Sequence, residues 1–213
     1  MEFAEKTLSS EQIYDGRIVK VFRDDVELSD GKKSFREVVR HSGGVVILAV
    51  KTAKQPGSEA AENSGKLNNF QLSTFNLQPD NRYTSSSQAF HTSILFVRQF
   101  RYPMKEVLLE LPAGKLEDGE EPFKAAKREL EEETGYCANK WTDLGYVYTS
   151  PGYSDEKLYL YMAEDLEYTK CRPDDGEILE PAEFSVNEAL EMIKDGKIID
   201  AKTLCAFMRA KLL

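Results

Sequence analysis

Residues 114–136, with the sequence GKLEDGEEPFKAAKRELEEETGY, constrain this chain most strongly, because they concentrate carboxylates on one short segment. Side chains three or four positions apart share one face of an α-helix, so a helix here places Glu129, Glu132 and Glu133 together. An apolar stripe at helical spacing adjoins this face and is expected to anchor the helix to a core; it consists of Phe123, Ala126 and Leu130. One face therefore packs while its neighbour gathers negative charge.

The gathered glutamates repel one another, and two explanations are open. Like charges at i,i+4 destabilise an isolated helix by about 0.2–0.5 kcal/mol per pair, and a bound cation would remove that repulsion. Ligands that are all oxygen suit a hard ion such as Mg2+ or Mn2+. A solvated, salt-bridged helix face is the alternative, because acidic helix faces are common. Charge alone does not decide between the two.

The order of the residues is more specific than their charge. The fixed positions are Gly114, then Glu120, then Arg128-Glu129-Leu130, then Glu132-Glu133, and finally Gly135 and the apolar Tyr136. Each of them resembles the Nudix box, G-x5-E-x7-R-E-U-x-E-E-x-G-U, where U is bulky and apolar. The resemblance implies an α/β (α+β) Nudix fold, with mixed β-sheets sandwiched between helices. It also implies hydrolysis of a nucleoside diphosphate linked to another moiety.

The same resemblance implies roles for residues in and beside the box. Metal ligands would be Glu129, Glu132 and Glu133, together with the backbone carbonyl of Ala113. The implied cofactor is Mg2+, with Mn2+ as a substitute. Arg128 is interpreted as a residue that orients the box glutamates, because it stands at i+4 to Glu132.

Three flanking segments resemble the ADP-ribose (ADP-sugar) pyrophosphatase branch of the family. They are residues 99–103 (QFRYP), 110–114 (ELPAG) and 149–156 (TSPGYSDE). By this match Arg101 contacts the diphosphate, since a guanidinium offers a planar fork to phosphate oxygens. An ordinary surface arginine is the alternative. Ser150 is expected near the substrate, and Glu156 near the terminal ribose or in a hydrogen bond that fixes the loop.

The acidic loop at residues 174–180 contains Asp-Gly-Glu ahead of a short apolar segment. In the resembled branch such a glutamate activates water or holds a further metal ion, and it corresponds to Glu177. A solvated acidic loop is the alternative. A box glutamate takes the role of general base if this loop stays open.

Residues 1–42 are predicted to form an N-terminal β subdomain, with strands at 18–22, 25–28 and 35–40 and a turn at 29–32. In the resembled branch a matching sheet is exchanged between two subunits, which implies a homodimer. Strands that fold back on their own subunit are the alternative. Phe35 is the candidate for stacking on adenine and Arg40 for a phosphate or ribose contact, although Phe35 also fits a plain core position.

Residues 43–213 are predicted to form the Nudix hydrolase domain. An apolar run at 45–50 predicts a strand buried on both faces, and the strand pattern resumes at 93–97. Between them, residues 51–92 form a polar stretch that is interpreted as an enlarged hairpin loop, either a tolerated insertion or a binding loop. Strands are also predicted at 144–148 and 158–163. A capping box at 185–188 predicts a helix to about Lys194, and Asp200 is expected to cap a last helix ending near Leu212.

Composition limits the setting in which the chain works. The net charge of −9 argues against a general nucleic-acid binder and against an RNA-decapping role. Three cysteines without C-x-x-C spacing and no signal-peptide pattern predict a reducing cytoplasm. No apolar run approaches the roughly 18 residues of a membrane span, so no membrane partner is expected.

The combined prediction is an enzyme that hydrolyses the diphosphate linkage of ADP-ribose, and of other ADP-sugars, to AMP and ribose 5-phosphate by metal-assisted attack of water. Its partner would be a small nucleoside diphosphate sugar. Two alternatives stay open. One is a Nudix hydrolase of another nucleotide sugar or dinucleotide, and the other is a non-catalytic Nudix protein that binds ADP-ribose.

Overall fold

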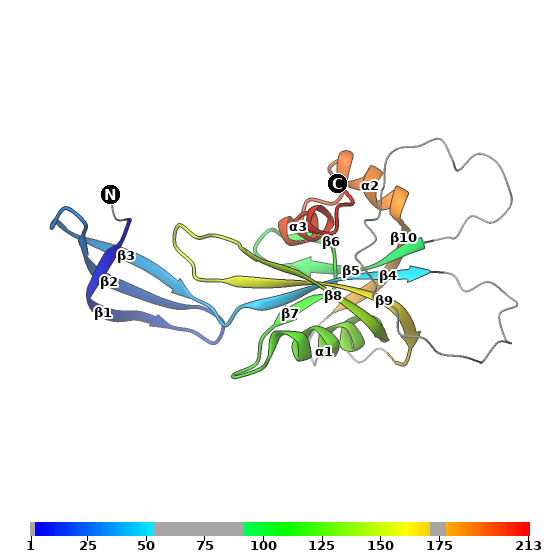
Figure 1. The fold of residues 1–213 in the computed structure, drawn as a ribbon, viewed down its shortest axis with the longest axis horizontal. Coiled ribbons are helices and arrows are strands. Elements are labelled where there is room, and N and C mark those ends of the chain that lie inside the picture. Colours follow the sequence, from blue (N-terminus) through cyan, green and yellow to red (C-terminus); the bar gives the residue numbers. More distant parts are fainter. Residues whose placement is uncertain (1–2, 53–91, 171–177) are drawn as a thin grey trace, which may run out of the picture.

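Figure 1 shows the computed structural model, which describes residues 3–52, 92–170 and 178–213. The strands of these residues form two sheets, one with three strands and one with seven. The smaller sheet is N-terminal and projects from one end of the larger one (Figure 1).

The small sheet contains β1 (Glu5–Asp15), β2 (Lys20–Leu28) and β3 (Lys33–Arg40), paired antiparallel in that order. The predicted break between residues 18–22 and residues 25–28 is wrong, because β2 runs without interruption from Lys20 to Leu28; residues 18 and 19 precede the strand. The polar pair between them looked like a break, yet Asp24 is 9% exposed and accepts a hydrogen bond from Ser10. The sequence also did not predict β1, whose residues are all exposed and therefore show no alternation of apolar and polar side chains.

The large sheet has the strand order β10-β5-β4-β9-β8, and β6 and β7 pair with β5 and β4 respectively. Its strands are β4 (Gly44–Thr52), β5 (Thr92–Arg101), β6 (Glu106–Glu110), β7 (Ala113–Lys115), β8 (Tyr136–Tyr148), β9 (Lys157–Tyr168) and β10 (Leu179–Ser185). The central pair β4 and β9 is parallel, and the other pairs are antiparallel. The sheet is therefore mixed, as predicted.

Helices cover both faces of the large sheet. Helix α1 (Pro122–Thr134) lies on one face, and α2 (Val186–Lys194) and α3 (Ala201–Arg209) lie on the other (Figure 1). Strand β4 serves both layers: Val45 and Ile47 pack on the α1 side, whereas Val46 and Leu48 pack on the α3 side. Alternation along one buried strand thus supplies two cores. The predicted fold, a mixed sheet between helices, is confirmed.

Local signals placed several elements correctly. Ser185 and Glu188 form the predicted capping box of α2, and the Asp200 side chain accepts a hydrogen bond from the Thr203 N–H at the start of α3. Helix α3 ends at Arg209, before the predicted Leu212, because Lys211 adopts a left-handed backbone with φ 59°.

The two strands that flank the polar stretch pair as a hairpin, with Thr52 opposite Thr92. Residues 53–91, which make up nearly all of that predicted loop, lie outside the described residues. Strands β8 and β9 are both longer than predicted. Of the helices that the structure describes, none is both long enough and apolar enough to cross a membrane.

Candidate active site

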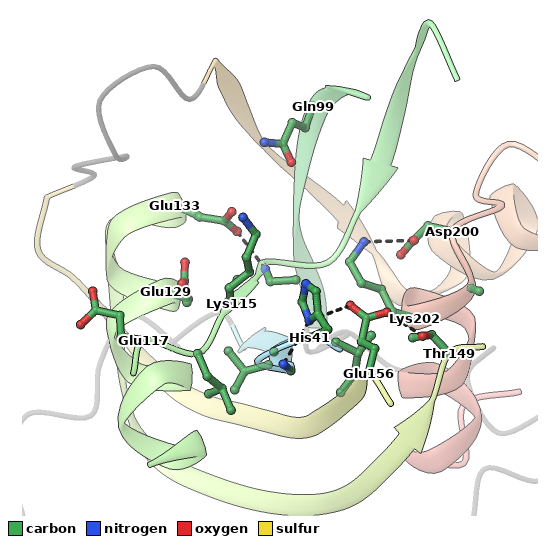
Figure 2. Close-up of a pocket in the computed structure, with 18 of the residues that line it drawn as sticks. His41, Gln99, Lys115, Glu117, Glu129, Glu133, Thr149, Glu156, Asp200 and Lys202 are labelled. Atoms are coloured by element: carbon green, nitrogen blue, oxygen red, sulfur yellow. Dashed lines mark hydrogen bonds and ion pairs between the residues drawn. The ribbon is translucent and has the colours of Figure 1, made fainter. Parts of the chain in front are cut away.

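A cavity of about 500 Å³ lies where α1, the paired strands β4 and β7, and the start of α3 come together. Figure 2 shows Glu129 and Glu133 on one side of this pocket and Asp200 and Lys202 on the other. The rest of the wall comes from segments that are distant in sequence, including His41, Gln99, Arg101, Thr149 and Glu156.

Helix α1 presents its acidic face to the cavity because its other side is buried. Ala126 and Leu130 are fully buried against the large sheet, which fixes the rotation of the helix. Glu129 and Glu133 are then only 9% and 3% exposed. The helix ends at Gly135, whose φ of 76° suits a left-handed C-cap.

Arg128 binds three glutamates of the box. Its Nε and Nη2 atoms donate to Glu120 at 3.0 Å each, and its Nη1 donates to Glu129 at 2.7 Å and to Glu132 at 2.9 Å. The pKa of the Arg128 guanidinium is raised above its usual range, and the hydrogen bonds to Glu120 are the largest cause. The structure therefore contains the predicted contact between Arg128 and Glu132, and Arg128 joins the acidic groups into one network.

Glu133 is held by the strand that precedes the helix. The backbone N–H of Ala113 in β7 donates to Glu133 Oε2 at 2.9 Å. Ala113 lies opposite Val46 of β4, so the large sheet fixes its position. Glu133 and Ala113, which were both predicted as metal-site residues, are thus joined at the cavity by this hydrogen bond.

Arg101 lines the cavity and is anchored to a buried carboxylate. Its Nε and Nη2 atoms donate to the two oxygens of Glu110 at 2.7 Å each, and Glu110 is 1% exposed. Burial raises the pKa of Glu110, but hydrogen bonds from Arg101 and attraction by Lys202 outweigh it, so the net pKa is below the usual range. Arg101 is therefore held in one orientation at the cavity wall.

Lys202 was missed by sequence reasoning. Its Nζ atom contacts both Glu110 and Asp200, and the contact to Asp200 measures 3.0 Å. The sequence predicted Asp200 only as a helix cap, and no motif includes Lys202. Only the packing of α3 against the sheet brings this lysine to the pocket.

Glu156 lines the cavity and fixes its own loop. The Thr149 hydroxyl donates to Glu156 at 2.6 Å, and the His41 Nδ1 atom lies 3.5 Å from the same carboxylate. His41 was also missed, since a lone histidine carries no spacing signal. Ser150 is absent from the described lining of the pocket, and its carbonyl accepts hydrogen bonds from the N–H groups of Tyr153 and Ser154.

Other predicted site residues lie elsewhere on the described chain. Phe35 and Arg40 are on β3 in the N-terminal sheet and do not line this pocket. Arg23 lies over the Phe35 ring at 4.9 Å, and Arg40 lies over the Phe22 ring at 4.0 Å. Glu132 contacts Arg128 but does not line the pocket, and Glu177 lies outside the described residues.

The cavity has a carboxylate wall on α1, and its lining also includes Arg101 and Lys202, which are paired with Glu110 and Asp200. Cations and metal-binding carboxylates around one cavity suit a phosphorylated substrate. Residues 86–207 match the family described as NUDIX domain, and residues 5–39 match that described as nucleoside diphosphate sugar hydrolase N-terminal domain. The chain belongs to the Nudix hydrolase family.

Similar proteins agree with this assignment. An ADP-ribose pyrophosphatase of Bacillus subtilis (strain 168) is 37% identical over 210 residues, which cover 98% of this chain and 93% of that protein. A methanol dehydrogenase activator of Bacillus methanolicus is 37% identical over 206 residues, covering 96% and 91% of the two chains. A solved structure described as an ADP compounds hydrolase shares the fold, with a TM-score of 0.71 at 19% identity over 99% of this chain and 95% of that one.

Proposed function

We propose that this Nudix hydrolase cleaves the diphosphate linkage of ADP-ribose to AMP and ribose 5-phosphate. The observation that carries the proposal is the cavity itself, which is lined by Glu129 and Glu133 and also by Arg101 and Lys202. Figure 2 shows Lys202 across the cavity from the two glutamates. A diphosphate suits such a cavity, because Arg101 and Lys202, together with a metal ion that the carboxylates would hold, would neutralise its charge. The Bacillus subtilis relative, an ADP-ribose pyrophosphatase, supports the choice of substrate.

Nudix hydrolases generally need divalent cations, and the Glu129 and Glu133 carboxylates that line this cavity suit a hard ion. We assign Glu129, Glu132, Glu133 and the Ala113 carbonyl to Mg2+, with Mn2+ as a substitute. A bound cation would neutralise phosphoryl charge and lower the pKa of water. In the part of the chain that the structure describes, no three His, Cys, Asp or Glu side chains already form a metal-binding group. Cation binding is therefore expected to move these carboxylates.

The chain's own residues then orient the substrate. Arg128 holds Glu129 and Glu132 in register for ligation. Arg101 binds the diphosphate through the N–H groups that Glu110 does not use. Glu177 is assigned as the general base, and a box glutamate takes that role if the loop of Glu177 stays open. Glu156 and Ser150 belong to the loop that we assign to the ribose end.

We also propose that residues 1–42 form a dimerisation subdomain, and that residues 43–213 form the catalytic domain. The small sheet projects from the body and exposes the apolar side chains of Ile13, Tyr14 and Phe35, and the connection between β1 and β2 exposes Ile18. A second copy would cover them. Exchange of this sheet would bring Phe35 and Arg40 of one subunit to the pocket of the other, where they contact adenine and phosphate or ribose. Sedimentation equilibrium is expected to give twice the chain mass of 24.2 kDa, and a monomer would contradict the exchange.

A substrate panel tests the catalytic proposal. The protein is incubated with Mg2+ and, separately, with ADP-ribose, ADP-glucose, NADH, GDP-mannose, diadenosine tetraphosphate and 8-oxo-dGTP. AMP is expected to form fastest from ADP-ribose, and no AMP from ADP-ribose would overturn the assignment. Fast cleavage of GDP-mannose is the second candidate, since a GDP-mannose pyrophosphatase of Yersinia pestis (strain Pestoides F) is 34% identical over 129 residues, which cover 56% of this chain and 65% of that protein. Binding without cleavage would indicate a non-catalytic Nudix protein.

A further inference from the structure

We propose that Lys202 and Arg101 together form a two-cation subsite for a phosphoryl group, and that buried Glu110 is the positioning residue for both. This inference rests on the proposed function, because it names the groups that bind the diphosphate on the wall opposite α1. Lys202 comes from α3, far in sequence from the Nudix box. It is therefore a substrate contact that no sequence motif marks.

The first argument is the burial of Glu110. Its side chain is 1% exposed at the end of β6, and a carboxylate in such a place is unfavourable unless it is paired. Arg101 binds both of its oxygens, and Lys202 contacts one of them. One carboxylate thus ties a cation from β5 to a cation from α3 and fixes the distance between them.

The second argument is the hold on Lys202 from its own helix. Asp200 Oδ1 lies 3.0 Å from Lys202 Nζ, while Asp200 Oδ2 accepts hydrogen bonds from the N–H and the hydroxyl of Thr203. Thr203 is fully buried and its hydroxyl also accepts a hydrogen bond from the Leu111 N–H at 3.0 Å. Glu110 and Asp200 therefore both contact the Lys202 ammonium group. Figure 2 shows Lys202 at the pocket wall beside Asp200.

The third argument is the number of donors left for a ligand. A guanidinium has five N–H groups and an ammonium has three. Within the described residues, Arg101 uses two of its N–H groups on Glu110, and Lys202 contacts Glu110 and Asp200. Both residues line the cavity, and the described part of the chain leaves each with a donor for a ligand. A phosphoryl group offers several acceptor oxygens and matches such a pair of cations.

The competing explanation is that Lys202 serves only to neutralise buried Glu110. A double-mutant comparison separates the two, with inorganic pyrophosphate as the probe and EDTA present, so that ligand binding is read without metal or turnover. Isothermal titration calorimetry compares the wild type with K202M, and then E110Q with E110Q/K202M. K197M is the matched control. Lys197 is an exposed lysine whose Nζ atom lies 3.0 Å from Asp195 Oδ2, and it does not line the pocket.

We expect K202M to weaken pyrophosphate binding by about tenfold or more in the wild type, as is typical of a lost charged hydrogen bond, and K197M to leave it unchanged. In the E110Q background the loss should be smaller but still measurable, because Lys202 keeps its ion pair with Asp200 there. Steady-state kinetics with ADP-ribose should show the loss of K202M mainly in KM. If K202M does not fold, the comparison of E110Q with E110Q/K202M still tests the proposal, because the glutamine in E110Q is neutral and needs no cation beside it. Equal affinities of E110Q and E110Q/K202M would overturn the proposal. A further outcome separates this inference from the proposed function. If K202M weakens pyrophosphate binding but the wild type does not cleave ADP-ribose, only the proposed function is overturned.

Discussion

The Glu129 carboxylate lies directly against the Cα atom of Gly114. A Cβ atom placed on Gly114 would stand 1.9 Å from the carboxylate carbon and 1.9 Å from one of its oxygens. The first glycine of the Nudix box is therefore required by the side chain of a proposed metal ligand. Gly114 does not adopt a left-handed backbone. Glycine is needed here because any larger side chain would collide with Glu129.

G114A is expected to reduce turnover by about tenfold or more while leaving most of the stability. The clash involves the end of a flexible side chain, so Glu129 moves away and the backbone stays. The kcat with Mg2+ and the melting temperature are measured together. G196A is the control: Gly196 has φ 69° in the turn after α2, so alanine there should lower stability without changing kcat. Normal turnover by G114A would contradict the role of Glu129.

E133Q is expected to reduce kcat by about 100-fold or more with little change in stability. Glutamine keeps an oxygen that accepts from the Ala113 N–H, so the fold is retained, whereas the charge that binds a cation is lost. E131Q on the same helix is the control, because Glu131 contacts Thr169 outside the pocket. Cation affinity is measured by Mg2+ titration of activity. Equal kcat values for E133Q and the wild type would refute ligation by Glu133.

R101A is expected to raise KM for ADP-ribose and to lower the free energy of unfolding by about 3 kcal/mol. The second effect arises because Glu110 loses its bidentate partner while it stays buried. R98A is the control on the same strand: Arg98 and Glu180 form a pair at 3.4 Å with both side chains exposed, which contributes about 0–1 kcal/mol. Kinetics and urea unfolding are measured for both variants. An unchanged KM in R101A would make Arg101 a structural residue only.

Acid is expected to destabilise the protein partly through Glu110. Its folded-state pKa is lowered, because Arg101 and Lys202 outweigh the effect of burial, so the unfolded chain binds its proton more readily. The stabilising contribution is complete above the unfolded pKa of about 4.3 and is lost as pH falls through the lower folded value. The free energy of unfolding is measured between about pH 7 and pH 3 in the wild type and E110Q. E110Q should lose less stability on acidification, and parallel curves would contradict the assignment.

Patterns that depend on neighbouring residues were read correctly from the sequence. The acidic face of α1, the capping box at Ser185 and the cap at Asp200 all involve groups within about one helical turn, where chain geometry fixes the contacts. The buried run in β4 was equally clear, because both of its faces are covered.

Sequence patterns failed where burial does not follow periodicity. Strand β1 is exposed along its whole length, so its side chains alternate in no readable way. Strand β2 contains Asp24, a buried charge paired with Ser10 and Arg40 from the strands on both sides. A single polar residue inside a strand looks like a turn until its partners are known.

The sequence by itself determined the family, the carboxylate wall and the start of each C-terminal helix, because these follow from the spacing of residues along one helix or one turn. Only the tertiary structure decided that Arg101, Glu110 and Lys202 form one ion network facing that wall, and that His41 and Thr149 flank Glu156. Glu110 and Lys202 are 92 residues apart. No local pattern encodes such a contact, since it depends on how α3 packs on the sheet.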